Sequence, residues 1–421
     1  MYALIEKLYP ICRSITGNGV RETLNIIREI VPLQTHEVPT GTKVFDWSVP
    51  KEWNIKDAYV KNSRGEKVID FKKSNLHILN YSIPVKSSMS REELMSHLFT
   101  LSESPDWIPY RTSYYNENWG FCLSHKDYQK LSDDKYEVFI DATLDDGHLT
   151  YGELLIKGLQ KDSEVLISTH VCHPSLCNDN LSGIAVAAFL AHHLSLLPLQ
   201  YTYRFLFIPG TIGSITWLAL NERNVGRIKH GLVATCLGDS GRFTYKKTRR
   251  GDTEIDAVVR HVLENSVKDS RIVDFSPYGY DERQYCSSGF NLPVGCLMRT
   301  THGEYPQYHT SADDLSFVSP QNLADSLSMY LEVVGVLEGN KKYLNLNPKC
   351  EPQLGSRGLY QKIGGAEQGK NLQMAIMWVL NMSDGSHSLL DIAQLSGQSF
   401  GLLCEAAGLL QEAGLLEECS S

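Results

Sequence analysis

The 421-residue chain changes its pattern of hydrophobic and polar positions three times. Residues 1 to about 45 carry apolar side chains at helical spacing, with a turn at Gly17 and Gly19 and an end at Pro32. From 47 to 146, short apolar runs such as 58–60, 67–71, 77–81 and 137–140 alternate with Pro, Ser and Asn turns. That alternation predicts a small, mostly β domain rich in aromatic residues, which we interpret as core rather than as a binding surface.

Between about 150 and 340, apolar runs of strand length alternate with longer helical segments. The predicted strands are 165–168, 203–208, 232–237 and 294–298, and the predicted helices are 182–197, 215–221, 255–266 and 320–337. Such alternation is typical of a doubly wound α/β sheet. Because a helical segment precedes the β region, we expect a mixed-sheet catalytic domain formed by 1–46 and 147–344, with 47–146 inserted into it.

The tail, residues 345–421, predicts a third, winged-helix-like domain. Three short helices are expected at 372–380, 389–395 and 400–413, followed by a wing from Gly414. The tail holds four basic and eight acidic residues, a net charge of −4, and 398–413 contains no Lys or Arg. DNA binding first requires neutralisation of phosphates, so a protein contact or homo-oligomer contact is expected here instead of nucleic-acid binding.

Composition excludes several classes of protein. The net charge of −9 disfavours nucleic acid or an anionic membrane as the main partner. The ten cysteines form no Cys-x-x-Cys pair, which disfavours a thiolate zinc knuckle. No apolar run approaches the roughly 20 residues that span a bilayer, and the first residues lack the features of a secretory leader. A cytoplasmic protein is therefore expected.

Residues 168–183, Ser-Thr-His-Val-Cys-His-Pro-Ser-Leu-Cys-Asn-Asp-Asn-Leu-Ser-Gly, carry the strongest chemical signal. They place His170, His173 and Asp179 between a predicted buried strand and a helix. Imidazoles and a carboxylate are ligands that suit a divalent metal, zinc above all. The alternative is a polar loop with a helix cap at Ser182.

Two later segments supply matching ligands. Asp239 follows the strand at 232–237, and His309 lies in the sequence Tyr-His-Thr-Ser-Ala-Asp at 308–313. A metal-bound imidazole usually donates its second nitrogen to a carboxylate or carbonyl, so Asp313 is expected either to orient His309 or to cap the following helix.

These motifs, Asn-Asp-Asn-Leu-Ser-Gly at 178–183 and Tyr-His-Thr-Ser-Ala-Asp at 308–313, resemble those of the M28 class of zinc aminopeptidases. The resemblance implies that Asp179 bridges two zinc ions, that His170 and Asp239 complete one site, and that His309 binds the second ion. The whole chain resembles bacterial aminopeptidase-like proteins with an inserted domain of unknown function and a C-terminal winged helix, on the segments 13–21, 211–214 and 290–294.

The chain departs from this pattern after the strand at 203–208. The M28 class has adjacent glutamates there, one as general base and one as zinc ligand, and the closer group has Glu at the place of Gly210. Glu304 is the replacement base that the sequence offers, unless it is a solvated loop carboxylate, and His173 or Cys172 could fill the vacated ligand position. One tightly held zinc ion is expected, with a second, weaker one left open.

The sequence therefore leaves two hypotheses. The first is a zinc-dependent aminopeptidase-like hydrolase of a small peptide or amide-linked metabolite, in which Arg283 and Tyr285 contact the substrate. Arg283 could hold a carboxylate by two hydrogen bonds, although a surface salt bridge is an equal alternative. The second is a catalytically impaired pseudo-peptidase that serves as a metal-stabilised binding or scaffold protein.

Overall fold

The computed structural model describes residues 1–266, 269–359 and 367–419. The chain forms two compact units. Unit 1 contains Met1–Asp256 and Val267–Tyr330, and unit 2 contains Ala257–Ser266 and Leu331–Ser421.

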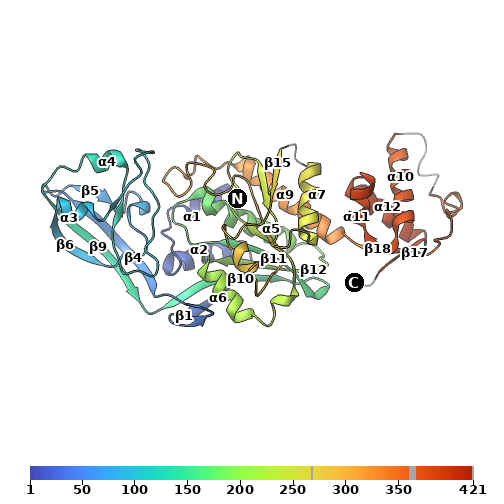
Figure 1. Ribbon diagram of the computed structural model, residues 1–421, viewed down its shortest axis with the longest axis horizontal. Coiled ribbons are helices and arrows are strands. Elements are labelled where there is room, and N and C mark those ends of the chain that lie inside the picture. Colours follow the sequence, from blue (N-terminus) through green and yellow to red (C-terminus); the bar gives the residue numbers. More distant parts are fainter. Residues whose placement is uncertain (267–268, 360–366, 420–421) are drawn as a thin grey trace. The chain divides into compact units, whose positions relative to one another are not determined.

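Unit 1 is built around an eight-stranded mixed sheet in the order β1-β10-β12-β11-β13-β16-β14-β15. Figure 1 labels β1, β10, β11, β12 and β15 of this sheet. Neighbouring strands are parallel from β12 to β16 and antiparallel at β1, β10 and the β14–β16 pair. The strands are β1 Gln34–Pro39, β10 His148–Ile156, β11 Gln160–His170, β12 Tyr201–Ile208, β13 Ile228–Ala234, β14 Phe243–Lys246, β15 Ser270–Val273 and β16 Val294–Met298. The predicted mixed α/β architecture is confirmed.

The helices of unit 1 begin and end close to the predicted positions. Helix α5 (Gly183–Leu194) is apolar on nearly all sides because it packs on the central strands β11, β12 and β13. The others are α1 Tyr2–Leu8, α2 Asn18–Arg28, α6 Ile212–Asn221 and α8 Glu282–Tyr285, with the short turns η2 Cys177–Ser182 and η3 Val225–Arg227. Helices α7 (Glu254–Ser266) and α9 (Pro320–Gly339) run from unit 1 into unit 2.

The segment between β1 and β10 forms a separate four-stranded antiparallel sheet in the order β5-β4-β9-β6 (Figure 1). Its strands are β4 Glu52–Lys61, β5 Lys67–Asp70, β6 Val85–Ser90 and β9 Lys135–Asp145. Around it lie β2 Lys43–Val44, β3 Trp47–Ser48, β7 Leu98–Phe99, β8 Phe121–Cys122, η1 Asn75–His77, α3 Arg91–Met95 and α4 His125–Gln129. Since β1 and β10 pair with each other in the large sheet, this arrangement is consistent with an insertion.

One expected strand is absent from the small sheet. The run 77–81 forms η1 and isolated bridges instead. Its backbone N–H groups donate to loop carbonyls, Leu79 to Gly120 and Asn80 to Arg111, so it has no continuous partner strand. Alternating apolar residues alone could not reveal that the neighbouring chain is irregular.

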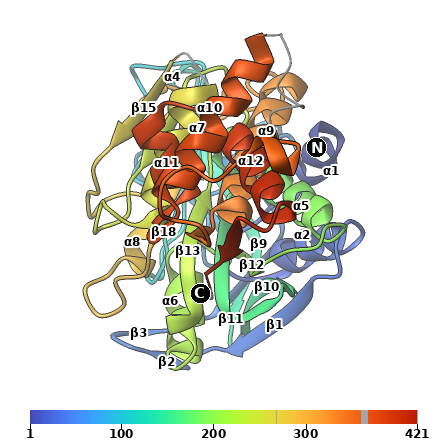
Figure 2. The same cartoon turned by 90° about the vertical axis from the view of Figure 1, so that its right-hand side faces the viewer.

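After the ends of α7 and α9, the described part of unit 2 has three helices and a three-stranded sheet, as the winged-helix prediction requires. The helices are α10 Glu367–Met382, α11 Leu389–Ser396 and α12 Phe400–Glu412, which gather together in Figure 2. The strands β17 Lys342–Asn345, β18 Asp384–Ser388 and β19 Leu416–Glu418 pair in the order β18-β17-β19, and η4 spans Gly355–Arg357. Ser388 and Asp391 form a reciprocal cap at the start of α11.

An ion pair joins α2 to the start of the small sheet. Both terminal nitrogens of Arg21 donate to the Glu52 carboxylate at 2.7 Å, and Arg21 Nε donates to Glu37 at 2.7 Å. The hydrogen bonds from Arg21 lower the pKa of Glu52 from 4.5 to about 2. A carboxyl group with a lowered pKa stabilises the fold above its unfolded pKa, and this stabilisation is lost as the pH falls towards its folded pKa.

We predict that Glu52→Gln lowers the free energy of unfolding by about 1–3 kcal/mol at pH 7, because it leaves Arg21 without its two-point partner. The difference from wild type should narrow between pH 4.5 and pH 3 in urea denaturation. Glu29→Gln is the matched control, since the Lys7–Glu29 pair is exposed and should contribute under about 1 kcal/mol. Equal losses in the two variants would contradict this prediction.

Candidate metal centre

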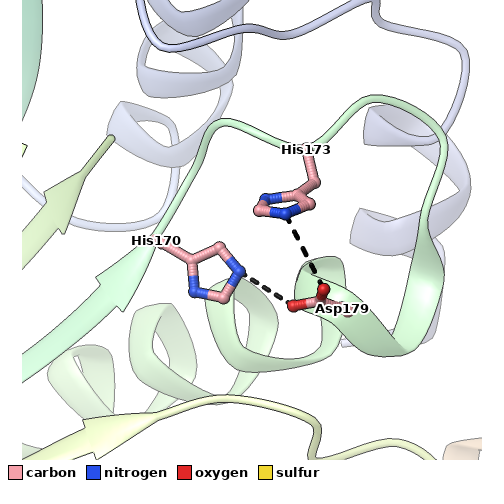
Figure 3. A group of neighbouring side chains, drawn as sticks. All are labelled: His170, His173 and Asp179. Carbon is pink, nitrogen blue, oxygen red and sulfur yellow. Dashed lines mark hydrogen bonds and ion pairs between the residues drawn. The ribbon is translucent and has the colours of Figure 1, made fainter. Parts of the chain in front are cut away.

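The predicted ligands His170, His173 and Asp179 converge at the carboxyl end of β11 (Figure 3). His170 is the last residue of β11, His173 lies on the loop that follows, and Asp179 lies in η2 just before α5. Loops at the carboxyl ends of parallel strands are where open α/β sheets usually bind ligands. His170 is 3% exposed and Asp179 is fully buried.

The two carboxylate oxygens of Asp179 face different imidazoles. Oδ1 lies 2.9 Å from His170 Nε2, whereas Oδ2 lies 3.0 Å from His309 Nε2 and 3.7 Å from His173 Nε2. His173 Nε2 and His309 Nε2 are 3.2 Å apart. The structure therefore places His309 beside Asp179, where the sequence predicts it. One oxygen of Asp179 faces His170, and the other faces His173 and His309.

Three of these atoms fit the ligand shell of one zinc ion. Donors bound tetrahedrally at 2.0–2.1 Å lie about 3.3 Å from one another. Asp179 Oδ2 lies 3.0 Å from His309 Nε2 and 3.7 Å from His173 Nε2, and the two imidazole nitrogens are 3.2 Å apart. Asp179 Oδ2 is also buried and accepts no hydrogen bond of good geometry. A buried carboxylate oxygen without a donor is costly, and a cation at this point would satisfy it.

The charge states of the cluster also suit a metal. Burial alone would raise the pKa of Asp179, but the hydrogen bond from His170 holds it well below its usual value. Burial lowers the pKa of His173 well below its usual value, which keeps the imidazole neutral. A carboxylate and neutral imidazoles are the forms that bind metal ions.

The side chain of Asp313 supports the loop of Asp179 and does not contact His309 in any described hydrogen bond. Its Oδ1 accepts the backbone N–H of Asn178 at 2.6 Å, and its Oδ2 accepts that of Asp179 at 2.9 Å. Burial raises the pKa of Asp313 to about 8, against the effect of these two hydrogen bonds. The two alternatives expected for Asp313 are orientation of His309 and a cap on the helix that follows it in the chain. Its oxygens instead accept two N–H groups of η2, which lies earlier in the chain.

Asp239 lies beyond the cluster of close ligand atoms. It is 3% exposed, and it accepts hydrogen bonds from Thr300 Oγ1 and Gly241 N through Oδ1 and from Asn178 Nδ2 through Oδ2. Asn178, the residue before Asp179, therefore links Asp239 to the Asp179 loop. Ligation by Asp239 stays a prediction, since its oxygens are occupied by these donors.

The segment between β1 and β10 holds the His309 loop in place. We call this segment the insertion, because β1 and β10 pair with each other in the large sheet. His309 has a left-handed backbone with φ of 56°, a conformation that is unfavourable for a residue with a side chain. Its carbonyl accepts the N–H of Tyr110 at 2.8 Å, and Ile108 and Ser311 exchange two further hydrogen bonds. These contacts from the insertion compensate for the strained backbone and fix the imidazole.

A cavity of about 440 Å³ opens onto the cluster. Its aromatic lining comes partly from the insertion, as Trp47, Tyr110, Tyr114 and Tyr115, and partly from the large-sheet loops, as Tyr280 and Tyr308. The Tyr280 ring stacks on His170 and the Tyr308 ring stacks on His309, with ring centres 5.3 and 4.0 Å apart. The interpretation of the insertion's aromatic residues as core alone is therefore incomplete, because sequence gives no sign of which aromatic faces meet the later motifs.

Gly210 lies on the cavity wall beside His170. A Cβ atom at this position would lie 3.6 Å from His170 Cβ and 3.5 Å from Cys172 Sγ, which is ordinary contact. The carboxylate near this point comes from another element, because Asp281, just before α8, accepts the N–H of Thr211 at 2.7 Å and the Ser214 hydroxyl at 3.1 Å. Asp281 is 4% exposed, and burial raises its pKa above the usual value.

The remaining predicted site residues lie in different surroundings. Glu304 pairs with Arg271 at 2.8 Å, is 48% exposed and is absent from the described cavity lining. Tyr285 is fully buried, with its hydroxyl 2.9 Å from that of Ser168, and is also absent from that lining. Arg283 does line the cavity and donates to Thr211 Oγ1 at 3.1 Å. Burial raises the pKa of Cys172 to about 12.

None of the described helices has the length and apolar character that a membrane crossing requires.

Two families match the chain. Residues 2–340 match the family described as a domain of unknown function (DUF4910), and residues 341–418 match a winged helix-turn-helix family. A Clostridium acetobutylicum protein is 57% identical over 417 residues, which are 99% of this chain and 96% of the relative. That relative is named as a candidate polysaccharide biosynthesis protein with an aminopeptidase-like domain.

Solved structures confirm the resemblance at the level of the fold. A crystal structure of a candidate peptidase from Clostridium acetobutylicum matches with a TM-score of 0.94 and 55% identity, over 99% of this chain and 96% of that one. The zinc aminopeptidase BSAP of Bacillus subtilis matches with a TM-score of 0.58 and 13% identity, over 80% and 93% of the two chains. A peptidase M28 precursor from Shewanella amazonensis gives 0.56 and 13%, over 80% and 92%.

We predict that Asp313→Asn lowers the free energy of unfolding by about 1–3 kcal/mol and weakens metal binding, because an amide has one acceptor oxygen for two buried N–H groups. Thermal unfolding and metal titration would measure the two effects. Asp314→Asn is the control, since Asp314 accepts hydrogen bonds from its near neighbour Ser316. Unchanged metal affinity in Asp313→Asn would contradict the supporting role.

Proposed function

Because the chain belongs to the DUF4910 family and has the fold of zinc aminopeptidases, we propose that it is a zinc-dependent aminopeptidase-like hydrolase of a small peptide or amide-linked metabolite. The observation that carries the proposal is the buried Asp179 carboxylate, whose Oδ2 lies among imidazoles without a hydrogen-bond donor. A structural ion pair would use a permanent cation, whereas His173 is held neutral by burial.

His170, His173, Asp179 and His309 would hold the metal. His173 would replace the glutamate ligand that Gly210 cannot supply, since its Nε2 lies 3.2 Å from that of His309. Asp239 is the proposed additional ligand on the His170 side, where Asn178 connects it to the Asp179 loop. Bound zinc would supply an activated water and a Lewis acid for a substrate carbonyl.

Asp281 is our proposed proton acceptor in place of Glu304. It is the one carboxylate among the described residues that line the cavity. Its Oδ1 is anchored beside Gly210 by Thr211 and Ser214, which leaves Oδ2 to accept a proton. A buried carboxylate in a cleft whose pKa is raised is the usual form of a general base.

A second candidate function rests on Gly210. Without a side chain at this position the cavity beside His170 lacks the carboxylate that the resemblance implies, so a metal-stabilised scaffold that binds without hydrolysis is the alternative. The winged-helix unit would then supply a protein or homo-oligomer contact, because α12 carries no Lys or Arg with which to bind DNA. We place the protein in the cytoplasm.

We predict that the purified protein binds at least one equivalent of zinc and that a chelator abolishes its amide hydrolysis. His173→Ala should lower the zinc affinity by about 10- to 1,000-fold, because it removes one of the few ligands. Metal analysis after dialysis and hydrolysis of mixed dipeptides and aminoacyl amides would measure both. The exposed His192→Ala is the control, and full zinc affinity in His173→Ala would place the ligands elsewhere.

We predict that Asp281→Asn lowers kcat by about 10²–10⁴-fold while zinc content is retained, because the amide keeps the acceptor for Thr211 but cannot take a proton. Gly210→Glu in the Asp281→Asn background should restore part of the activity, since the structure has room for a Cβ at position 210.

Glu304→Gln is the matched control and should leave kcat unchanged. If Asp281→Asn is fully active, Asp281 is not the base. If wild type hydrolyses nothing but Gly210→Glu does, the scaffold reading is correct for the natural chain.

A further inference from the structure

The described wall of the cavity carries few charges. Apart from the imidazoles, its described lining residues include one carboxylate, Asp281, and one permanent cation, Arg283. Asp281 is occupied through Oδ1 by Thr211 and Ser214, and the proposed function uses its second oxygen. No described carboxylate pairs with Arg283. The wall therefore offers a positive charge to a ligand.

Arg283 forms no ion pair with any described residue. Its one hydrogen bond runs from Nη2 to Thr211 Oγ1, and Nε is buried without an acceptor. A guanidinium has five N–H donors in a planar fork that matches a carboxylate. Leaving such donors unpaired is costly, so the arrangement suits a ligand anion better than an empty wall.

The guanidinium is carried on a firmly anchored element. Next to it in α8, Glu282 forms a fully buried ion pair with Lys246 at 2.8 Å, and Tyr285 contacts Ser168. Asp281 fixes the other end to the loop after β12. Thr211, which receives the Arg283 hydrogen bond, follows Gly210 beside His170. The positive charge is therefore held at a defined place next to the metal cluster.

The rest of the wall is aromatic. Tyr110 and Tyr114 both line the cavity, and their hydroxyl groups lie 2.9 Å apart. At the rim, Trp47 and Tyr115 pack edge to face with ring centres 5.4 Å apart, and they are 41% and 49% exposed. Exposed aromatic pairs beside a cavity suit a flat ring.

We infer that the substrate is an amide that carries a carboxylate, bound by Arg283, and a ring, held against the aromatic wall of the insertion. This inference rests on the proposed function and narrows its substrate class. It favours an acid-terminated amide over a peptide recognised by its free amino group, because the cavity offers a cation to an anion and no spare carboxylate to an ammonium group.

A binding experiment on the full-length, zinc-loaded protein tests this inference without requiring turnover. The probe is 3-benzoylpropionate, an analogue of benzoylglycine in which CH₂ replaces the amide N–H, compared with its primary amide by calorimetry. Wild type should bind the acid about 10- to 100-fold more tightly than the amide, as expected for charge-assisted hydrogen bonds. Arg283→Met should abolish the preference, and Arg283→Lys should keep part of it.

A control variant tests whether the effect is specific to Arg283, and ligands with and without a ring test the aromatic wall. Arg249→Met is the control, since this exposed side chain contacts Asn291 outside the described lining. Levulinate, which lacks the ring, should bind more weakly than 3-benzoylpropionate, and Trp47→Ala should reduce that difference. The methyl glycoside of glucuronic acid tests a sugar ring, and either ring-bearing acid binding better than levulinate supports the inference.

Three results would overturn it: equal binding of acid and amide in wild type, an unchanged preference in Arg283→Met, or tighter binding of phenylalaninamide than of the acid. The unchanged preference would assign the carboxylate to the metal. If the protein binds acids selectively but hydrolyses no amide, the proposed hydrolase function is rejected and the inferred ligand class stands. If it hydrolyses amides without preferring acids, the inferred substrate class is rejected and the hydrolase function stands.

Discussion

A fully buried carboxylate is the constraint on which the candidate site depends. Among the described residues, imidazoles alone pair with the Asp179 carboxylate, and an isolated charge in a protein interior is strongly unfavourable. The imidazoles of His170, His173 and His309 surround its two oxygens, and the hydrogen bond from His170 lowers its pKa against the effect of burial. Two separate stretches of chain, residues 170–179 and the loop of His309, must therefore converge, which is why the site lies where β11 ends and the motif loops meet.

The supporting contacts are shared between distant segments. Asp313 holds the backbone of Asp179, although it belongs to the same motif as His309. Tyr110, from the insertion, holds the carbonyl of His309 in a left-handed conformation that costs free energy. Breaking either contact would therefore disturb both Asp179 and His309. The insertion thus supports the cluster as well as lining the cavity above it.

The sequence predicted what depends on local spacing. Strands such as 294–298, the helix that begins at Pro320 and the approach of His309 to Asp179 follow from periodicity and from motifs that resemble a known class. It did not predict contacts that depend on how loops cross. The sequence interprets Tyr114 and Tyr115 as core, because the segments that meet them in the cavity lie far along the chain. It offers the Glu304 carboxylate as available, because its partner Arg271 lies 33 residues away.

Gly210 has no side chain, yet the cavity wall beside it still contains a carboxylate, that of Asp281. The loop after β12 keeps a strained backbone at Thr211, with φ of 62°, and the Asp281 side chain satisfies its N–H. Asp281 thus holds the residue next to Gly210, and both Gly210 and Asp281 line the cavity. The proposed hydrolysis needs a proton acceptor near the metal ligands, and a packed α/β domain can supply a carboxylate there from more than one strand end.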